Sequence, residues 1–189
     1  MAEKNLDFDT VIDRTHTNSL KYDFAVQRGK PKDVLPLWVA DMDFQVSSYI
    51  QEALSGNVAH GIFGYSEVEG SYFEAVAGWM SRHYGWNVEE TWLVKTPGIV
   101  FALAQAVRAF TEPGDAVLLQ QPVYYPFSQV IRDNGRKIVD NTLVQGEDGR
   151  YRIDFTDFEE KIRSAHVKLF FLCNPHNPVG RVWTKEELL

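Results

Sequence analysis

Short apolar stretches alternate with amphipathic stretches from residue 91 onward, and this alternation constrains the fold more than any other feature. The expected strands are 92–95, 116–120, 137–144 and 167–173. Between them lie three expected helices: one at 99–110, one that Gly135 stops, and one that begins near Thr156. Strand and helix in strict succession are typical of βαβ units, whose parallel strands are covered on both faces. The pattern predicts an α/β fold, a three-layer αβα sandwich with a mostly parallel sheet.

The first 45 residues lack this alternation. They have an acidic opening, two prolines and a single long apolar stretch, PLWVADMDF. We expect residues 1–45 to form an N-terminal arm and part of a small domain. Residues 46–189 would then form a larger domain that is incomplete at its C-terminal end.

Capping-box spacings mark three expected helix starts, at Ser48 and Gln51, Ser71 and Glu74, and Thr184 and Glu187. Gly56 is expected to end the first of these helices. The last one has room for a single turn before Leu189, and a helix that short is not stable in water. We therefore expect the sequence to be the amino-terminal part of a longer one.

Composition favours small-molecule chemistry. A net charge of −7 argues against nucleic-acid and anionic-membrane partners, because both require a basic surface. Cys173 is the only cysteine, which excludes an intramolecular disulfide and suits a reducing compartment. The polar start has no apolar run that resembles a signal peptide or a membrane span. These features favour a cytoplasmic location.

Three strand ends carry distinctive residues: TPGIV at 96–100, QPVYY at 121–125 and CNPHNP at 173–178. Ligands of open α/β sheets bind beyond the carboxyl ends of the strands. In TPGIV, a helix amino terminus could hold a phosphate, although an ordinary turn explains it more readily. In QPVYY, one tyrosine could stack on a flat ligand, although a core aromatic is the commoner case. In CNPHNP the prolines fix the backbone, which favours an Asn amide aimed at a ligand.

Competing motifs are absent or weak. The sequence contains no G-x-G-x-x-G, no P-loop and no nucleophile elbow. Cys173 and His176 lack a second pair of metal ligands, and we interpret Cys173 as a buried strand residue. We therefore expect no metal site.

Five segments together resemble one family: PLWVADMDF, FGYS, TPGIVFAL, QPVYYPF and CNPHNPVGRVWT. They are similar to the MalY/PatB-type cystathionine β-lyases, which are pyridoxal-phosphate enzymes of the aspartate aminotransferase fold. The resemblance extends from about Phe8 to the end of the chain. It implies pyridoxal 5'-phosphate as cofactor, a sulfur-containing amino acid as substrate, and a homodimer with shared active sites. The implied reaction is an α,β-elimination that gives a thiol, pyruvate and ammonia.

The resemblance also implies site residues. Gly98, Ile99 and Val100 would offer backbone N–H groups to the cofactor phosphate. Tyr124 would stack on the pyridine ring, and Asn177 would donate to its phenolic oxygen.

Two further segments receive roles in the same way. Tyr65 matches a tyrosine that reaches the phosphate in the neighbouring subunit, and Val39 and Ala40 match backbone that lines the substrate carboxylate site. By likeness to the fold, the Gln121–Pro122 and Asn177–Pro178 bonds are expected to be cis. The first strand, at 92–95, is expected to lie apart from the other three, because its neighbours come from later sequence.

The family's lysine that binds the cofactor has an S-x-x-K spacing, which this sequence lacks. We therefore expect no catalytic lysine here and no activity of this chain alone. Two alternatives stay open: a class I/II aminotransferase on the same scaffold, and a noncatalytic binding or regulatory protein that keeps the pyridoxal-phosphate domain.

Overall fold

The computed structural model describes residues 6–189. The chain divides into two compact units, Met1–Gly70 and Ser71–Leu189. The domain boundary that the sequence placed after residue 45 concerns the complete protein and stays a prediction.

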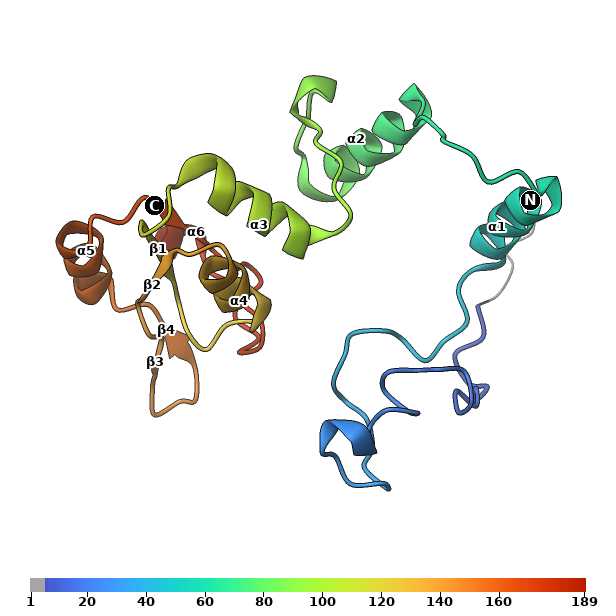
Figure 1. The fold of residues 1–189 in the computed structure, drawn as a ribbon, viewed down its shortest axis with the longest axis horizontal. Helices are drawn as coiled ribbons and strands as arrows, with labels where there is room; N and C mark the ends of the chain where they lie inside the picture. The colour runs from blue at the N-terminus through green and yellow to red at the C-terminus, as the bar shows by residue number, and fades with distance from the viewer. Residues whose placement is uncertain (1–5) are drawn as a thin grey trace. The chain divides into compact units, whose positions relative to one another are not determined.

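The first unit is mostly irregular backbone (Figure 1). Its regular elements among the described residues are a short 3-10 helix, η1 (Val26–Arg28), and helix α1 (Ser48–His60). The positions of the ends of α1 differ from the prediction.

The side chain of Ser47, the residue before the predicted start, caps α1. The helix then runs through Gly56 and ends at Gly61, which has a φ of 73°. The predicted end at Gly56 is therefore wrong. A glycine inside a helix only weakens it, whereas the left-handed conformation that ends a helix strongly favours glycine.

The second unit contains the remaining elements. Its helices are α2 (Gly70–Tyr84, beginning at the boundary residue), η2 (Glu90–Trp92, a 3-10 helix), α3 (Ile99–Phe110), α4 (Pro126–Asp133), α5 (Phe155–Ser164) and α6 (Lys185–Leu188). Its strands are β1 (Ala116–Leu119), β2 (Lys137–Asp140), β3 (Val144–Gln145), β4 (Tyr151–Arg152) and β5 (Leu169–Phe170).

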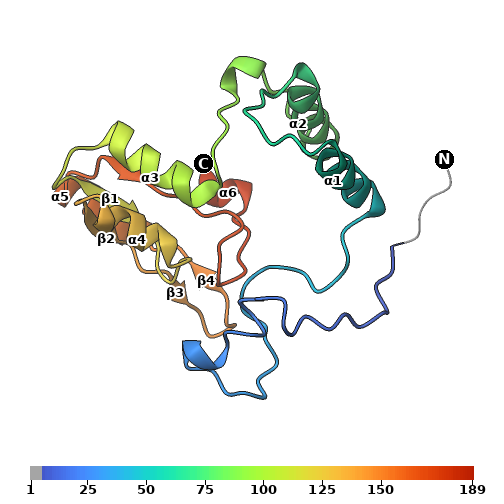
Figure 2. The same ribbon diagram turned by 45° about the vertical axis from the view of Figure 1, so that its right-hand side comes forward.

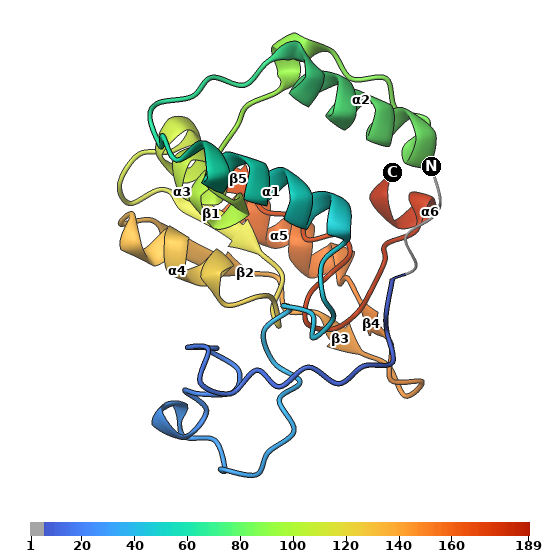
Figure 3. The ribbon, with the colours of Figure 1, turned by 90° about the vertical axis from the view of Figure 1, so that its right-hand side faces the viewer.

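The main sheet has three parallel strands in the order β2-β1-β5. In the central strand, Val117 lies opposite Ile138 of β2 and Leu169 of β5. Strands β3 and β4 follow β2 and precede α5 in the sequence, and they form a separate antiparallel hairpin (Figure 3). The parallel order with intervening helices confirms the predicted α/β topology.

Helices cover both faces of this sheet. Helices α3 and α4 contact each other on one face (Figure 2), where the cluster formed by Val107, Val117, Leu119, Val130, Ile131 and Phe171 is buried. On the other face, Phe158 of α5 packs edge-on against Phe170 of β5, with ring centroids 5.1 Å apart. The three-layer αβα arrangement is thus confirmed.

Several strand predictions need correction. Residues 93–95 belong to neither sheet, and Trp92 ends η2 instead of starting a strand. A strand forms only where a neighbour pairs with it, and this segment pairs with none of β1, β2 and β5, in agreement with the expectation that it lies apart from them. The strands predicted at 137–144 and 167–173 are also shorter, and only Lys137–Asp140 and Leu169–Phe170 pair in the main sheet.

The predicted helix starts at Thr184 and near Thr156 agree with the structure. In α6, Thr184 and Glu187 form the reciprocal capping box, with N···O distances of 2.8 and 3.3 Å. Helix α5 begins close to the predicted Thr156, although its cap is Asp154, which accepts from the N–H of Asp157. None of the helices in residues 6–189 has the length and apolar character needed to span a membrane.

Candidate functional site

The loops after β1 and β5 meet at the carboxyl edge of the sheet. The backbone N–H of Tyr124 donates to the carbonyl oxygen of Asn177 over 2.8 Å. The structure therefore brings together two of the residues to which the resemblance gives a role at the cofactor. The Gln121–Pro122 and Asn177–Pro178 bonds are cis, as expected, and so is Asn174–Pro175, which was not expected.

His176 makes a second link between the same loops. Its Nε2 lies 3.1 Å from the carbonyl oxygen of Pro122. Since a carbonyl only accepts, Nε2 carries the proton. The ring is 1% exposed and packs edge-on against Trp183, and Nδ1 has no hydrogen-bond partner in the described chain. This contact between His176 and Pro122 therefore holds the loop that carries Tyr124 next to the loop that carries Asn177.

The rest of the CNPHNP turn is tied to the segment after it. The indole N–H of Trp183 donates to the carbonyl of Cys173, at 3.0 Å, and its backbone N–H donates to the side-chain oxygen of Asn174, at 3.1 Å. The Sγ of Cys173 accepts from the N–H of Asn177. Cys173 follows β5 and is only half-buried, so its interpretation as a buried strand residue is wrong.

Buried amides close the end of β1. Gln120 is 1% exposed and donates to the side-chain oxygen of Asn141, which is fully buried. Asn141 in turn donates to Asp157 of α5 over 2.8 Å. The sequence analysis gave these residues no role. The available signal was one amide in each of two expected strands, Gln120 in 116–120 and Asn141 in 137–144.

The amino terminus of α3 lies at the same edge. Helix α3 leads through a short turn into β1, so it runs against the strand direction and its first turn lies toward the strand's carboxyl end. Gly98 precedes the helix with φ 95° and ψ 162°, and no side chain caps its first turn. Nothing lies within 4 Å of the place that a Cβ on Gly98 would take. Ile99 and Val100 are exposed, so their backbone donors face this space, whereas the N–H of Gly98 donates to the carbonyl oxygen of Thr96, at 2.7 Å.

This donor set fits a phosphate, because free N–H groups at a helix amino terminus and the positive end of the helix dipole favour an anion. The ring of Tyr124 is 40% exposed and meets Tyr125 edge-on, with centroids 5.2 Å apart. An accessible tyrosine ring can stack on a flat ligand. The second unit thus offers phosphate donors, an aromatic surface and an amide residue on one edge of the sheet.

The remaining predicted site residues belong to the first unit. Tyr65 is fully exposed, and Val39 and Ala40 are exposed in the segment before Asp41. Their approach to the residues of the second unit stays a prediction.

The chain matches the family model "Aminotransferase class I and II" over residues 32–189. It belongs to this family. Among curated relatives, it is 47% identical to cystathionine β-lyase PatB of Bacillus subtilis and 32% identical to protein MalY of Escherichia coli. These matches cover 97% and 96% of the chain and 47% of each relative.

Solved structures agree with this placement. Cystalysin of Treponema denticola, whose structure contains pyridoxal 5'-phosphate, superposes with a TM-score of 0.88 at 38% identity. The pyridoxal-phosphate-bound C–S lyase of Staphylococcus hominis gives a TM-score of 0.87 at 36% identity. Each match covers 97% of this chain, and 47% and 46% of the other chain. The family resemblance is confirmed, and the chain spans about half the length of the relatives it matches.

Proposed function

We propose that this chain is the amino-terminal part of a pyridoxal-phosphate-dependent lyase that cleaves the carbon–sulfur bond of cystathionine or a related cysteine conjugate. The products would be a thiol, pyruvate and ammonia. The observation that carries the proposal is the junction of the two loops, in which Tyr124 and Asn177 are joined at 2.8 Å beside an uncapped helix amino terminus. The relatives PatB and cystalysin support the same reading.

The residues of the second unit would bind and orient the cofactor. The N–H groups of Gly98, Ile99 and Val100 would bind its phosphate. Tyr124 would cover one face of its ring, and the amide of Asn177 would donate to the ring oxygen. When bound, pyridoxal phosphate draws electrons away from the α-carbon of the substrate.

The residues of the first unit would act on the substrate and the partner. The backbone at Val39 and Ala40 would line the site of the substrate carboxylate. Tyr65 would reach the phosphate in a second copy of the protein, which makes the working form a homodimer. The lysine that takes the α-proton would come from sequence that follows this segment in the relatives, and the chain alone would be inactive in the cytoplasm.

The test completes the chain with the carboxyl-terminal half of PatB from Bacillus subtilis. We expect the completed protein to show the visible absorption of bound pyridoxal phosphate, which borohydride removes, and to release pyruvate from cystathionine. Replacing Asn177 by alanine should lower cofactor affinity and shift that absorption. The matched control is Asn57→Ala, at an exposed residue of α1, which should change neither property.

The outcomes separate the proposed function from its rivals. Family members also include aminotransferases, for example an aspartate aminotransferase that is 28% identical to this chain. Transfer of the amino group to a keto acid faster than pyruvate release would favour that alternative. A completed protein that binds no pyridoxal phosphate would contradict both the lyase and the aminotransferase proposals and favour a noncatalytic role.

A further inference from the structure

We propose that Arg14 and Lys21 are positioning residues, which clamp the segment Asp41–Asp43 and thereby fix the backbone of Val39 and Ala40 for the substrate's α-carboxylate. This inference rests on the proposed function. It assigns a role to two basic side chains that lie outside the loops of the cofactor site.

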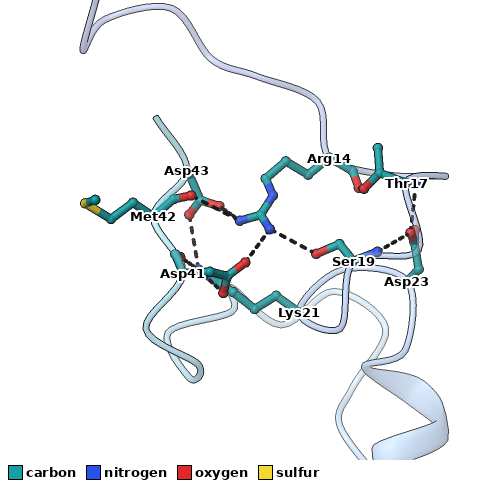
Figure 4. Close-up of polar contacts among 8 residues, drawn as sticks. All are labelled: Arg14, Thr17, Ser19, Lys21, Asp23, Asp41, Met42 and Asp43. Atoms are coloured by element: carbon teal, nitrogen blue, oxygen red, sulfur yellow. Dashed lines mark hydrogen bonds and ion pairs between the residues drawn. The ribbon is translucent and has the colours of Figure 1, made fainter. Parts of the chain in front are cut away.

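The clamp grips consecutive residues from one side (Figure 4). One terminal nitrogen of Arg14 donates to the carboxylate of Asp43, at 2.5 Å, and to the carbonyl of Met42, at 3.4 Å. The other donates to the carboxylate of Asp41 and to the hydroxyl of Ser19. A guanidinium is suited to this role because its planar fork holds several oxygens in fixed directions.

Lys21 supplies the second half of the clamp. Its ammonium donates to the carbonyl oxygen of Asp41, at 3.1 Å, and to the carboxylate of Asp43, at 3.3 Å. The Lys21 side chain is 6% exposed, although it carries a charge. A buried ammonium is stable only when it is paired, so the burial of Lys21 requires its contacts with Asp41 and Asp43.

The direction of the pKa shifts agrees with these pairings. Hydrogen bonds from Arg14 lower the pKa values of Asp41 and Asp43, and the two carboxylates raise the pKa of Arg14. Arg14, Asp41 and Asp43 are therefore charged at neutral pH.

The backbone next to the clamp is under strain. Val39 has a φ of 62°, in the left-handed region, which a β-branched residue rarely adopts. Such a conformation persists only where surrounding contacts enforce it. Val39 itself is 46% exposed, so burial of its side chain supplies little of that enforcement. The anchored residues begin two positions later, at Asp41.

Arg14 is a poor candidate for binding the substrate carboxylate directly. Both of its terminal nitrogens already donate to protein oxygens, including two carboxylates. A substrate carboxylate would have to displace one of these partners. The geometry instead points to an indirect action through the backbone of Val39 and Ala40.

The first test is backbone nitrogen-15 NMR relaxation on the 189-residue chain. Arg14→Leu and Lys21→Met should lower the order parameters of residues 39–43 from about 0.85, typical of rigid backbone, to below about 0.6, because charge-assisted hydrogen bonds no longer hold the segment. The matched control is Arg152→Leu, which removes another Arg–Asp pair, with Asp148, in the hairpin of the second unit. This control should leave the order parameters of residues 39–43 unchanged, and equal order parameters in all variants would overturn the clamp.

The second test uses the chain completed with the PatB half. Arg14→Leu should raise the KM for the amino acid about 10- to 100-fold, since small misplacements of positioning groups have effects of this size. Binding of the corresponding amine, which lacks the α-carboxylate, and the cofactor absorption should stay the same. Arg14→Lys should restore part of the affinity, because one ammonium replaces some contacts of the fork.

Each outcome has a distinct meaning. If the amino acid and the amine lose affinity equally, or neither does, the positioning role is wrong even though the enzyme works. If the unaltered completed protein binds no pyridoxal phosphate, the proposed function fails, and the relaxation experiment still decides whether the clamp exists.

Discussion

The loops that carry Tyr124 and Asn177 leave a sheet whose central strand is buried along its whole length, whereas the segment that carries Val39 and Ala40 is held by charged side chains. In the second unit, β1 and the helices α3 and α4 share one apolar cluster. Among the described residues of the first unit, Ala25 is the one member of the buried hydrophobic core.

The difference teaches how each group of site residues keeps its geometry. Apolar burial does not depend on the screening of charges or on protonation, and it fixes a backbone through dense packing. Ion pairs depend on ionic strength and on the protonation of each partner. We therefore expect the substrate-side segment to respond to pH and salt under conditions that leave the cofactor-side loops unchanged.

The largest expected effect comes from a substitution in the apolar core of the second unit. Ile131→Ala removes a fully buried side chain from the cluster between α3, α4 and the sheet, and should lower the free energy of unfolding by about 2–5 kcal/mol. Leu37→Ala is the matched control in the first unit, where the side chain is 85% exposed, and should change it by less than about 0.5 kcal/mol. Urea unfolding followed by circular dichroism measures both. Equal losses would mean that the first unit has an apolar core of its own.

A smaller effect compares two glycines. Gly98→Ala forces a side chain into φ 95° and ψ 162°, a region open almost only to glycine, and should cost about 1–3 kcal/mol and weaken cofactor binding. Gly56→Ala lies inside α1 with nothing within 4 Å of the added Cβ, and should instead stabilise by about 0.5–1 kcal/mol. Thermal unfolding gives the stability change, and titration of the completed protein with pyridoxal phosphate gives the affinity. If Gly98→Ala changed neither the stability nor the cofactor affinity, the strained turn before α3 would not be required for either.

Much of the second unit was predictable because its signals are local. The apolar face of α3, the capping box of Thr184 and Glu187, and the alternation of strand and helix each depend on residues a few positions apart. The location of Tyr124 and Asn177 at strand ends followed from the rule that ligands of open α/β sheets bind there, whereas the hydrogen bond between them was not predicted.

The first unit was less predictable because its contacts are long-range. Arg14 meets Asp41 and Asp43 across more than two dozen residues of irregular chain, and no periodicity marks such a pairing. Residues 93–95 were misassigned for a related reason. Their composition suits a strand, but a strand also needs a neighbour, and this segment pairs with none of the described strands.

The smallest expected effect concerns the ion pairs of the first unit and is a change in the pKa values of two carboxyl groups. Arg14 holds the pKa values of Asp41 and Asp43 below the ordinary 3.8, so their contribution to stability is complete above that value. It is lost as the pH falls through the lowered values, because the folded state must then take up protons that break the clamp. Carboxyl-carbon NMR titration of the chain should show both pKa values rising toward 3.8 in Arg14→Leu, with Asp43 still lowered in part by Lys21.

The matched control for this titration is the exposed pair in the hairpin. Arg152 lowers the pKa of Asp148 to about 2, and Arg152→Leu should return it toward 3.8 without moving Asp41 or Asp43. Both variants remove one arginine, so a general change in net charge would shift all three carboxyls alike. Ordinary pKa values for Asp41 and Asp43 in the unaltered chain would mean that the clamp does not form in solution. The substrate-side segment would then depend on contacts made elsewhere in the complete protein.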